Sequence, residues 1–158
     1  MGQEIERQRF LLVDGHSMVF GHPDLGAMHR RSPAAARVEL ERRLTSYQDV
    51  TGTRVVVVFD GAGPRTTEEP RSPGGIQVFY AAAGETADTV IERLARRYAG
   101  DYPMVVATED RAEQDAVVAA GAQWIGLSGL MALLERAGRE SAGRLRELAR
   151  RGMRPPTQ

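Results

Sequence analysis

The sequence predicts an α/β fold in which a mostly parallel central sheet is covered by helices on both faces. Short apolar segments alternate along the chain with longer segments whose apolar residues recur at helical spacing. One short segment, RVVVVF at residues 54–59, is apolar after its first residue and rich in β-branched side chains, which is typical of a strand covered on both sides. Together these observations predict a sheet enclosed between two helical layers.

The first half of the chain is expected to supply two strands and one long helix. Phe10–Val13 is apolar and predicts the first strand. Ser32 followed by Pro33 has the form of a helix N-cap and a first helical residue, and Gly52 ends that helix before the strand at 54–59. The apolar face of this helix is expected to contain Ala36, Leu40, Leu44 and Tyr47.

The second half continues the alternation after a long loop. Residues 61–75 are rich in glycine and proline and predict a loop, of the kind that in compact domains tends to be functional or mobile. The helix from Thr86 to Tyr98 has the clearest apolar stripe in the chain. The other expected elements are strands at 76–80, 104–107 and 123–125, a helix at 111–120, a helix from a Ser128 cap to Leu134 and, beyond Gly138, a separate polar helix.

The length and the charge pattern predict one domain with a basic end. The 158 residues suit a single domain, expected at 1–138, followed by an Arg-rich C-terminal helix and frayed tail at 139–158. All 21 basic residues are arginine, and the segment 136–154 holds seven of them against two glutamates. A basic tail can contact nucleic acid or simply form a solvated helix face, and the sequence leaves both open.

Missing residue types exclude several classes of chemistry. The absence of cysteine excludes disulfides, thiol nucleophiles and thiolate metal sites, and the absence of lysine excludes Schiff-base chemistry and a P-loop. No G-x-G-x-x-G follows a strand and no G-x-S-x-G elbow is present. No apolar stretch is long enough to cross a membrane and the N-terminus has no signal-like apolar region, so a cytoplasmic location without membrane contact is expected.

Carboxylates follow three of the expected strands. Because the carboxyl ends of parallel strands meet at one edge of a sheet, we expect these acids to lie near one another. The helix that begins at Thr86 brings two further acids, three residues apart, to the same region. The expected group comprises Asp14, Asp60, Glu85, Asp88, Glu109 and Asp110.

Each of these acids also has a structural explanation. Asp14 and Asp60 precede glycines and can be turn residues, Asp88 suits the first turn of a helix, and Asp110 with Glu113 has the form of a capping box. Converging carboxylates, however, repel and raise one another's pKa unless a cation lies among them. Oxygen ligands favour Mg²⁺ or Mn²⁺, and such clusters typically serve phosphoryl chemistry.

Four segments sharpen this interpretation. They are LLVDGHSMVFGHPDL, VVVVFDG, GETADTVIERL and VATEDRAEQDAVVAAGAQWIG, and they cover most of residues 10–135. In sequence and order they resemble the YacP-like NYN domains, bacterial ribonucleases with a PIN-like three-layer fold. The resemblance implies Mg²⁺- or Mn²⁺-dependent endonucleolytic cleavage of single-stranded RNA. At least one family member acts on mRNA within the translating ribosome, so a ribosomal partner stays open.

The resemblance also implies roles for individual residues. Asp14, Asp88 and Asp110 match the metal-binding aspartates of the family, with Asp60 in support. Where the family usually has D-G-Y-N, this chain has D-G-H-S at residues 14–17. Where the family usually has a serine before the last aspartate, this chain has Glu109, which like Glu85 is an additional acid. Side chains expected to hold substrate or water are His16, Ser17, Arg65, Arg71, Thr108 and Arg111. His16, His22 and His29 have no zinc-like spacing and lie in a segment expected to be a loop.

Two other functions are compatible with the same fold. A catalytically weakened module that binds RNA or the ribosome is favoured by the two departures, Ser17 and Glu109. A phosphatase of small phosphate esters is the second, although such enzymes often carry D-x-D at the first strand, where this chain has His16 as the second residue after Asp14.

Overall fold

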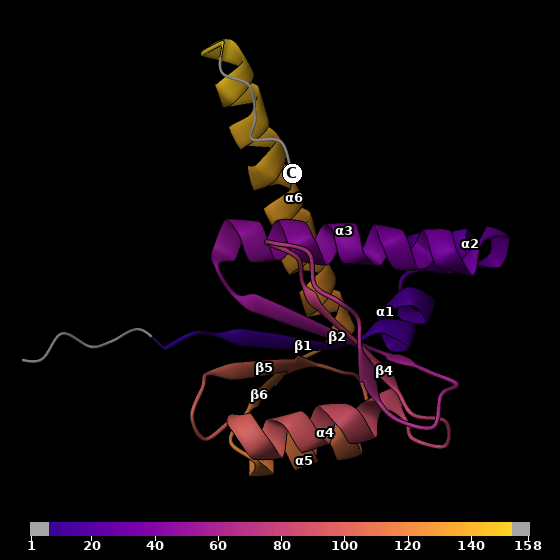
Figure 1. Ribbon diagram of the computed structural model, residues 1–158. Helices are drawn as coiled ribbons and strands as arrows, with labels where there is room; N and C mark the ends of the chain where they lie inside the picture. Colours follow the sequence, from indigo (N-terminus) through magenta and orange to yellow (C-terminus); the bar gives the residue numbers. More distant parts are fainter. Residues whose placement is uncertain (1–6, 153–158) are drawn as a thin grey trace, which may run out of the picture.

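The computed structural model describes residues 7–152, which form a six-stranded sheet between two layers of helices (Figure 1). The strand order is β3-β4-β2-β1-β5-β6, and every neighbouring pair is parallel except β3 and β4. This arrangement confirms the α/β fold with a mostly parallel sheet. The strands are β1 Phe10–Asp14, β2 Arg54–Asp60, β3 Thr67–Glu68, β4 Gln77–Ala81, β5 Met104–Ala107 and β6 Gln123–Ile125.

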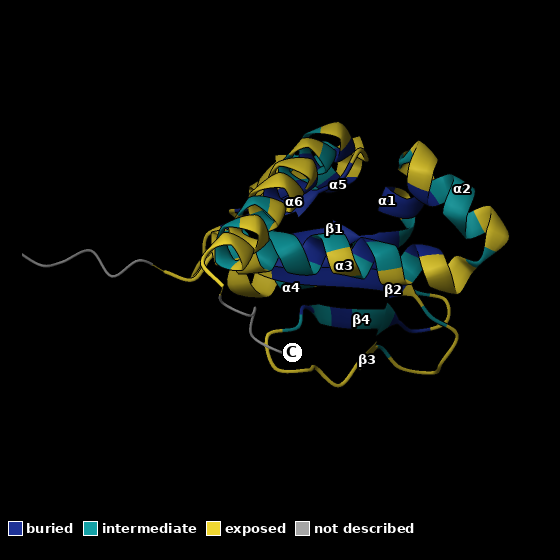
Figure 2. Cartoon of the chain, turned by 90° about the horizontal axis from the view of Figure 1, so that it is seen from above, coloured by how far each residue is buried: buried dark blue, intermediate teal, exposed yellow. Residues whose placement is uncertain are grey.

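Helices cover both faces of the sheet, as predicted. α1, α2, α3 and α6 pack on one face, and α4 and α5 pack on the other (Figures 1 and 2). The second half of α6 extends beyond the sheet (Figure 1). The helices are α1 Gly15–Gly21, α2 Pro23–Arg31, α3 Pro33–Thr51, α4 Ala87–Tyr98, α5 Arg111–Ala119 and α6 Leu127–Arg150. No helix within residues 7–152 is long and apolar enough to span a membrane.

The central strands supply both halves of the core. Successive side chains of a strand point to opposite faces, so Leu11 and Val13 of β1 enter the core under α3 and α6, whereas Leu12 enters the core under α4. Every residue of β2 from Val55 to Phe59 is buried. The uniformly apolar segment is therefore a strand covered on both faces, as expected from its composition.

Local capping signals predicted the helix ends well. The Ser32 side chain accepts a hydrogen bond from the Ala35 amide at 3.2 Å and Pro33 is the first residue of α3. Gly52 ends this helix in the left-handed conformation, with φ of 73°. The start of α4 also agrees with the predicted helix start, since the Thr86 hydroxyl accepts a hydrogen bond from the Thr89 amide. These ends confirm the sequence prediction because a cap is decided by residues a few positions away.

Two segments expected to be loops contain regular structure. Residues 15–31 form α1 and α2, so His16 and His29 are helical and His22 is the N-cap of α2, with Nδ1 accepting from the Asp24 amide at 3.2 Å. The long loop after β2 includes β3, which pairs antiparallel with β4. A histidine cap lies outside the usual cap residues, and a two-residue strand has no periodicity to detect.

The prediction for the last helices was wrong. Gly126, not Ser128, is the N-cap of α6, and the Glu109 Oε1 atom accepts a hydrogen bond from the Leu127 amide at 2.6 Å. The expected break at Gly138 is absent, because α6 is one continuous helix of 24 residues. An internal glycine costs a helix only about 1 kcal/mol, which packing of the first half of α6 on α3 offsets. The frayed tail expected after residue 152 lies outside the described residues.

The close packing of Gly15 leads to a stability prediction. A Cβ atom at residue 15 would lie 2.3 Å from the Phe59 ring, so Gly15→Ala is expected to lower the free energy of unfolding by about 1–3 kcal/mol. Chemical denaturation measures this change. Gly138→Ala is the matched control, because nothing lies within 4 Å of that position, and it should stabilise the helix by roughly 0.5–1 kcal/mol. Equal losses in both variants would contradict the packing argument.

Candidate active site

The buried carboxylate of Asp14 marks the carboxyl edge of the sheet. Asp14 ends β1 and is the N-cap of α1, where its Oδ1 atom accepts a hydrogen bond from the Ser17 amide at 3.1 Å. The residue is only 8% exposed. Gly15 is required because of the nearby Phe59 ring and has no positive φ, so Asp14-Gly15 is a strand-to-helix junction rather than a simple turn.

Asp88 brings a second carboxylate to Asp14. It lies in the first turn of α4, whose position is fixed by a hydrogen bond from the Ala87 amide to the Asp60 Oδ1 atom at 3.2 Å. The Asp88 carboxyl group is a near enough neighbour of both Asp14 and Glu113 to raise their pKa values. Burial raises the pKa of Asp14, and the neighbouring Asp88 raises it further, while the Ser17 amide opposes the shift. A cation or a proton at this position would therefore be stabilised.

Glu113 is the third member of this acid cluster (Asp14, Asp88 and Glu113). It is 2% exposed, and its Oε2 atom accepts a hydrogen bond from the Thr108 hydroxyl at 2.8 Å. Its Oε1 atom is buried and, among the described residues, has no hydrogen-bond donor. Burial, together with the Asp88 and Asp14 carboxyl groups, raises the pKa of Glu113 to about 8. An unpartnered buried carboxylate oxygen is costly unless a proton or a cation accompanies it.

Sequence reasoning treated Glu113 only as a capping partner of Asp110. Half of that capping box is present, since the Glu113 amide donates to the Asp110 Oδ1 atom at 2.9 Å. The Asp110 amide instead donates to the Thr108 hydroxyl at 3.0 Å, which leaves the Glu113 side chain free to turn inward. The available signal was spacing, because Glu113 and Val117 are the two buried residues of α5 and lie four residues apart on one face.

The two other predicted strand-tip aspartates are exposed. Asp110 follows β5, the neighbour of β1, and serves as the N-cap of α5. Asp60 ends β2, where its amide donates to the His16 Nδ1 atom at 3.3 Å and its Oδ2 atom lies 3.5 Å from the same nitrogen.

Glu85 and Glu109 are directed to structural partners. Glu85 accepts hydrogen bonds from Arg93 at 2.7 Å and from the Thr66 hydroxyl at 3.0 Å, and these two contacts, Arg93 first, lower its pKa. Glu109 caps α6 through the Leu127 amide. Neither side chain is among the groups that raise the pKa of Asp14 or Glu113.

The predicted arginines lie at different edges of the sheet. Arg111 is the first residue of α5, exposed beside Asp110, and Arg65 is exposed just before Thr66, whose hydroxyl contacts the residue after β4. Arg71 instead lines a cavity with Gly52 and Arg54, at the amino end of β2. The structure therefore brings Arg111 and Arg65 to the carboxyl edge but not Arg71, because the long loop runs the length of β4.

The acid cluster offers a cation only carboxylate oxygens. Within residues 7–152 no group of three histidine or acidic side chains is arranged so that it could hold a metal ion. The unpartnered Glu113 Oε1 atom and the raised pKa values of Asp14 and Glu113 nevertheless fit a divalent cation. Ligands of this type suit Mg²⁺ or Mn²⁺ better than softer metals.

The fold and this edge define an NYN-type α/β domain, and comparison with known proteins names the family. The family model for the YacP-like NYN domain matches residues 11–155, so the chain belongs to the YacP-like NYN domain family. Membership of this family implies ribonuclease chemistry. The chain is thus an NYN-domain protein related to Rae1 (YacP).

Individual relatives give the extent of the similarity. The chain is 36% identical over 113 residues to the uncharacterized protein YacP of Bacillus subtilis (strain 168), covering 71% of this chain and 66% of that protein, just under two thirds of its length. The crystal structure of Rae1 (YacP) from Bacillus subtilis aligns with a TM-score of 0.77 at 31% identity, over 90% of this chain and 83% of that one. Its W164L mutant aligns with a TM-score of 0.74 at 32% identity, over 94% and 86%.

The raised pKa of Glu113 predicts a specific pH dependence of stability. Its pKa is about 8 in the folded protein against an ordinary value of 4.5, so between these values the folded state binds more protons than the unfolded chain. The free energy of unfolding should therefore fall as pH rises from about 5 to 8. In a chelator, wild type should lose on the order of 1 kcal/mol, or about 2–4 °C of melting temperature.

Glu113→Gln tests this assignment, because glutamine matches the protonated side chain in shape and cannot ionise. Its melting temperature should change less than that of wild type across the same pH range. Asp49→Asn serves as the control, because Asp49 is an exposed acid near the carboxyl end of α3, and this variant should follow wild type. If Glu113→Gln has the wild-type pH profile, Glu113 is not the group that is destabilised on ionisation.

Proposed function

We propose that this protein is a Mg²⁺- or Mn²⁺-dependent endoribonuclease that cleaves single-stranded RNA at the carboxyl edge of its sheet. The observation that carries the proposal is the acid cluster itself. Two of its members, Asp14 and Glu113, are buried with raised pKa values beside a shared neighbour, Asp88, and one Glu113 oxygen has no partner among residues 7–152. A cation relieves both the repulsion and the missing hydrogen bond.

The residues that would hold the metal are Asp14, Asp88 and Glu113, with Asp110 at the adjoining helix end. A divalent cation bound there supplies the positive charge that activates water and stabilises the leaving oxygen of the scissile phosphate. Asp60 supports this arrangement indirectly, since it holds the first turn of α4, and hence Asp88, at the edge of β2. Two helix N-termini, of α1 and α5, add favourable partial charge for anionic groups.

The side chains around the acid cluster have separate tasks in this proposal. The Thr108 hydroxyl already donates to Glu113 and accepts from the Asp110 amide, so its task is to position Glu113 rather than to orient water. Ser17 is exposed on α1, three residues after Asp14, and in this proposal its hydroxyl contacts water or a phosphate oxygen. Arg111 and Arg65 are the arginines available for RNA phosphates at this edge.

The first alternative is a module with the same fold that binds RNA or the ribosome without cleaving it. The observations in its favour are that Asp110 is exposed and that, among the described residues, no three histidine or acidic side chains are arranged to hold a metal ion. The departure at Glu109 does not favour it, since that side chain caps α6 and leaves the acid cluster unchanged. RNA binding that persists in a chelator and yields no products when Mn²⁺ is supplied would support this alternative.

Melting temperatures with and without Mn²⁺ test the metal site. Mn²⁺ should raise the melting temperature of wild type, because a ligand present at 100 times its Kd adds about 2.7 kcal/mol of stability. Asp14→Asn and Asp110→Asn keep the caps that the aspartates provide to Ser17 and Glu113. Both variants should respond less to Mn²⁺, and Asp14→Asn should melt higher than wild type without metal because repulsion is relieved.

Asp49→Asn is again the control, because it removes an exposed acid at the opposite edge and should keep the full response to Mn²⁺. A wild-type protein that neither responds to Mn²⁺ nor cleaves single-stranded RNA would rule out the proposed activity. The binding module would then be the better interpretation.

The arginine assignments are tested by the salt dependence of RNA binding. Arg111→Ala should weaken binding of a single-stranded oligoribonucleotide in a chelator and reduce the slope of log K against log salt by about 0.7, the value for one phosphate contact. Arg71→Ala is the matched control, since that arginine lies at the amino edge and should leave the slope unchanged. Equal slopes in Arg111→Ala and wild type would remove Arg111 from the RNA-binding surface.

A further inference from the structure

Five aromatic and imidazole rings form a continuous row beside the acid cluster. Tyr80 stacks on Phe59 at 6.0 Å between ring centroids, and Phe59 meets His16 edge-to-face at 6.0 Å. His16 stacks on Phe20 at 6.0 Å with 23° between the ring planes, and Phe20 meets His29 edge-to-face at 4.8 Å. We call this row the aromatic strip (Tyr80, Phe59, His16, Phe20 and His29).

The aromatic strip starts at the candidate active site. His16 contacts the Asp60 amide, and Asp14 caps the helix that carries both His16 and Phe20. Phe20 is the sixth residue after Asp14, which places it about 9 Å further along the helix axis. Phe20 therefore lies near the candidate active site along α1.

The outer end of the strip is open to solvent. Phe59 is 2% exposed, whereas Phe20 is 62% exposed although it has ring neighbours on two sides. A single exposed apolar side chain is common in soluble proteins and proves nothing alone. Phe20 differs because His16 and His29 hold its ring in a defined orientation, so a flat ligand can stack on it at little further cost in side-chain entropy.

Cationic side chains line the same strip. The Arg37 guanidinium lies 4.6 Å from the centroid of the Phe59 ring and 5.3 Å from that of Tyr80. The last turn of α2, beside Phe20, contains His29, Arg30 and Arg31. Within residues 7–152, neither Arg30 nor Arg31 pairs with a carboxylate. An exposed ring beside arginines that no carboxylate neutralises matches a ligand that presents flat bases on an anionic backbone.

We propose that the Phe20 ring, at the exposed end of the aromatic strip, stacks on one unpaired base of the RNA that enters the active site, while His16 and His29 hold the ring in place. This inference rests on the proposed ribonuclease function and adds how that site recognises its substrate. A base in a duplex is already stacked on both faces, whereas a single strand can present its base to Phe20. Stacking on Phe20 would therefore give a preference for single strands and would require no particular base.

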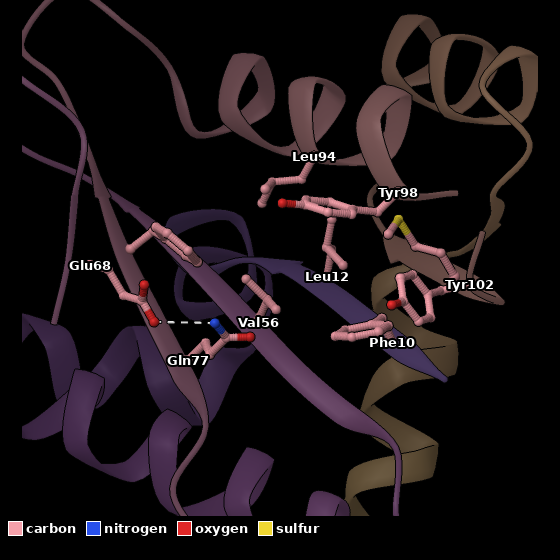
Figure 3. A pocket seen from close by; sticks show the side chains of 10 residues that line it. Phe10, Leu12, Val56, Glu68, Gln77, Leu94, Tyr98 and Tyr102 are labelled. Carbon is pink, nitrogen blue, oxygen red and sulfur yellow. Dashed lines mark hydrogen bonds between the residues drawn. The ribbon is translucent and has the colours of Figure 1, made fainter. Parts of the chain in front are cut away.

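The experiment compares binding of a fluorescent single-stranded oligoribonucleotide, in a chelator, to wild type, Phe20→Ala, Phe20→Trp and Tyr102→Ala. Phe20→Ala should raise Kd by about 5- to 150-fold, whereas Phe20→Trp should bind like wild type. Tyr102 is the control because it is also exposed but lines an apolar cavity at the amino ends of the strands (Figure 3). Its loss should not affect Kd. The melting temperature should not fall in Phe20→Ala, because the ring is largely outside the core.

The outcomes separate this inference from the proposed function. If Phe20→Ala binds RNA as tightly as wild type, while wild type cleaves RNA and responds to Mn²⁺, the proposed role of Phe20 is contradicted and the proposed ribonuclease function is not. An equal loss of affinity in Phe20→Ala and Phe20→Trp would also contradict the role of Phe20, because a larger ring should stack at least as well. With Mn²⁺ present, Phe20→Ala should raise the KM for RNA cleavage and leave kcat unchanged.

Discussion

Repulsion among buried carboxyl groups is the constraint around which the carboxyl edge of this protein is built. Asp14 and Glu113 are removed from water, and the Asp88 carboxyl group lies within reach of both. A fold that tolerates such a cluster needs either protons or a cation in it. The surrounding contacts hold the acids in place rather than neutralise them, since they come from the Ser17 amide and the Thr108 hydroxyl.

The rest of the edge is arranged so that these acids stay close. Phe59 packs where a Cβ of residue 15 would be, which lets α1 begin directly at the end of β1. A Cβ on Gly61 would lie 2.3 Å from the Ala81 carbonyl oxygen, so β2 and β4 separate only beyond that point. Asp60 then anchors the first turn of α4. Each of the two Asp-Gly pairs is therefore explained by close packing at a strand end, not by the conformational freedom of glycine.

The acid cluster and the aromatic strip divide two requirements of a nuclease. The cluster provides negative charge in a buried setting, which attracts a cation and repels the anionic substrate. The strip and the arginines beside it provide stacking surfaces and positive charge at the surface. Asp14 caps α1, and His16 and Phe20 lie on that helix, so under the two proposals an RNA strand held by Phe20 would lie near the acid cluster. This arrangement agrees with the ribonuclease chemistry implied by membership of the YacP-like NYN family.

Local sequence signals were enough to predict the α/β class, the strands other than β3, the helices α3, α4 and α5, the cap at Ser32, and the position of Asp14, Asp60 and Asp110 at one edge of the sheet. These features depend on periodicity and on residues a few positions apart, so they can be recognised locally.

Only the tertiary structure decided which acids face inward. It buried Glu113, turned Glu85 toward Arg93 and Glu109 toward the start of α6, and placed Arg71 at the far edge. It also assembled the aromatic strip from two strands and two helices. Side-chain burial and pairing are set by packing between segments far apart in the chain, such as Gly15 against Phe59, and no local pattern of residues encodes that packing.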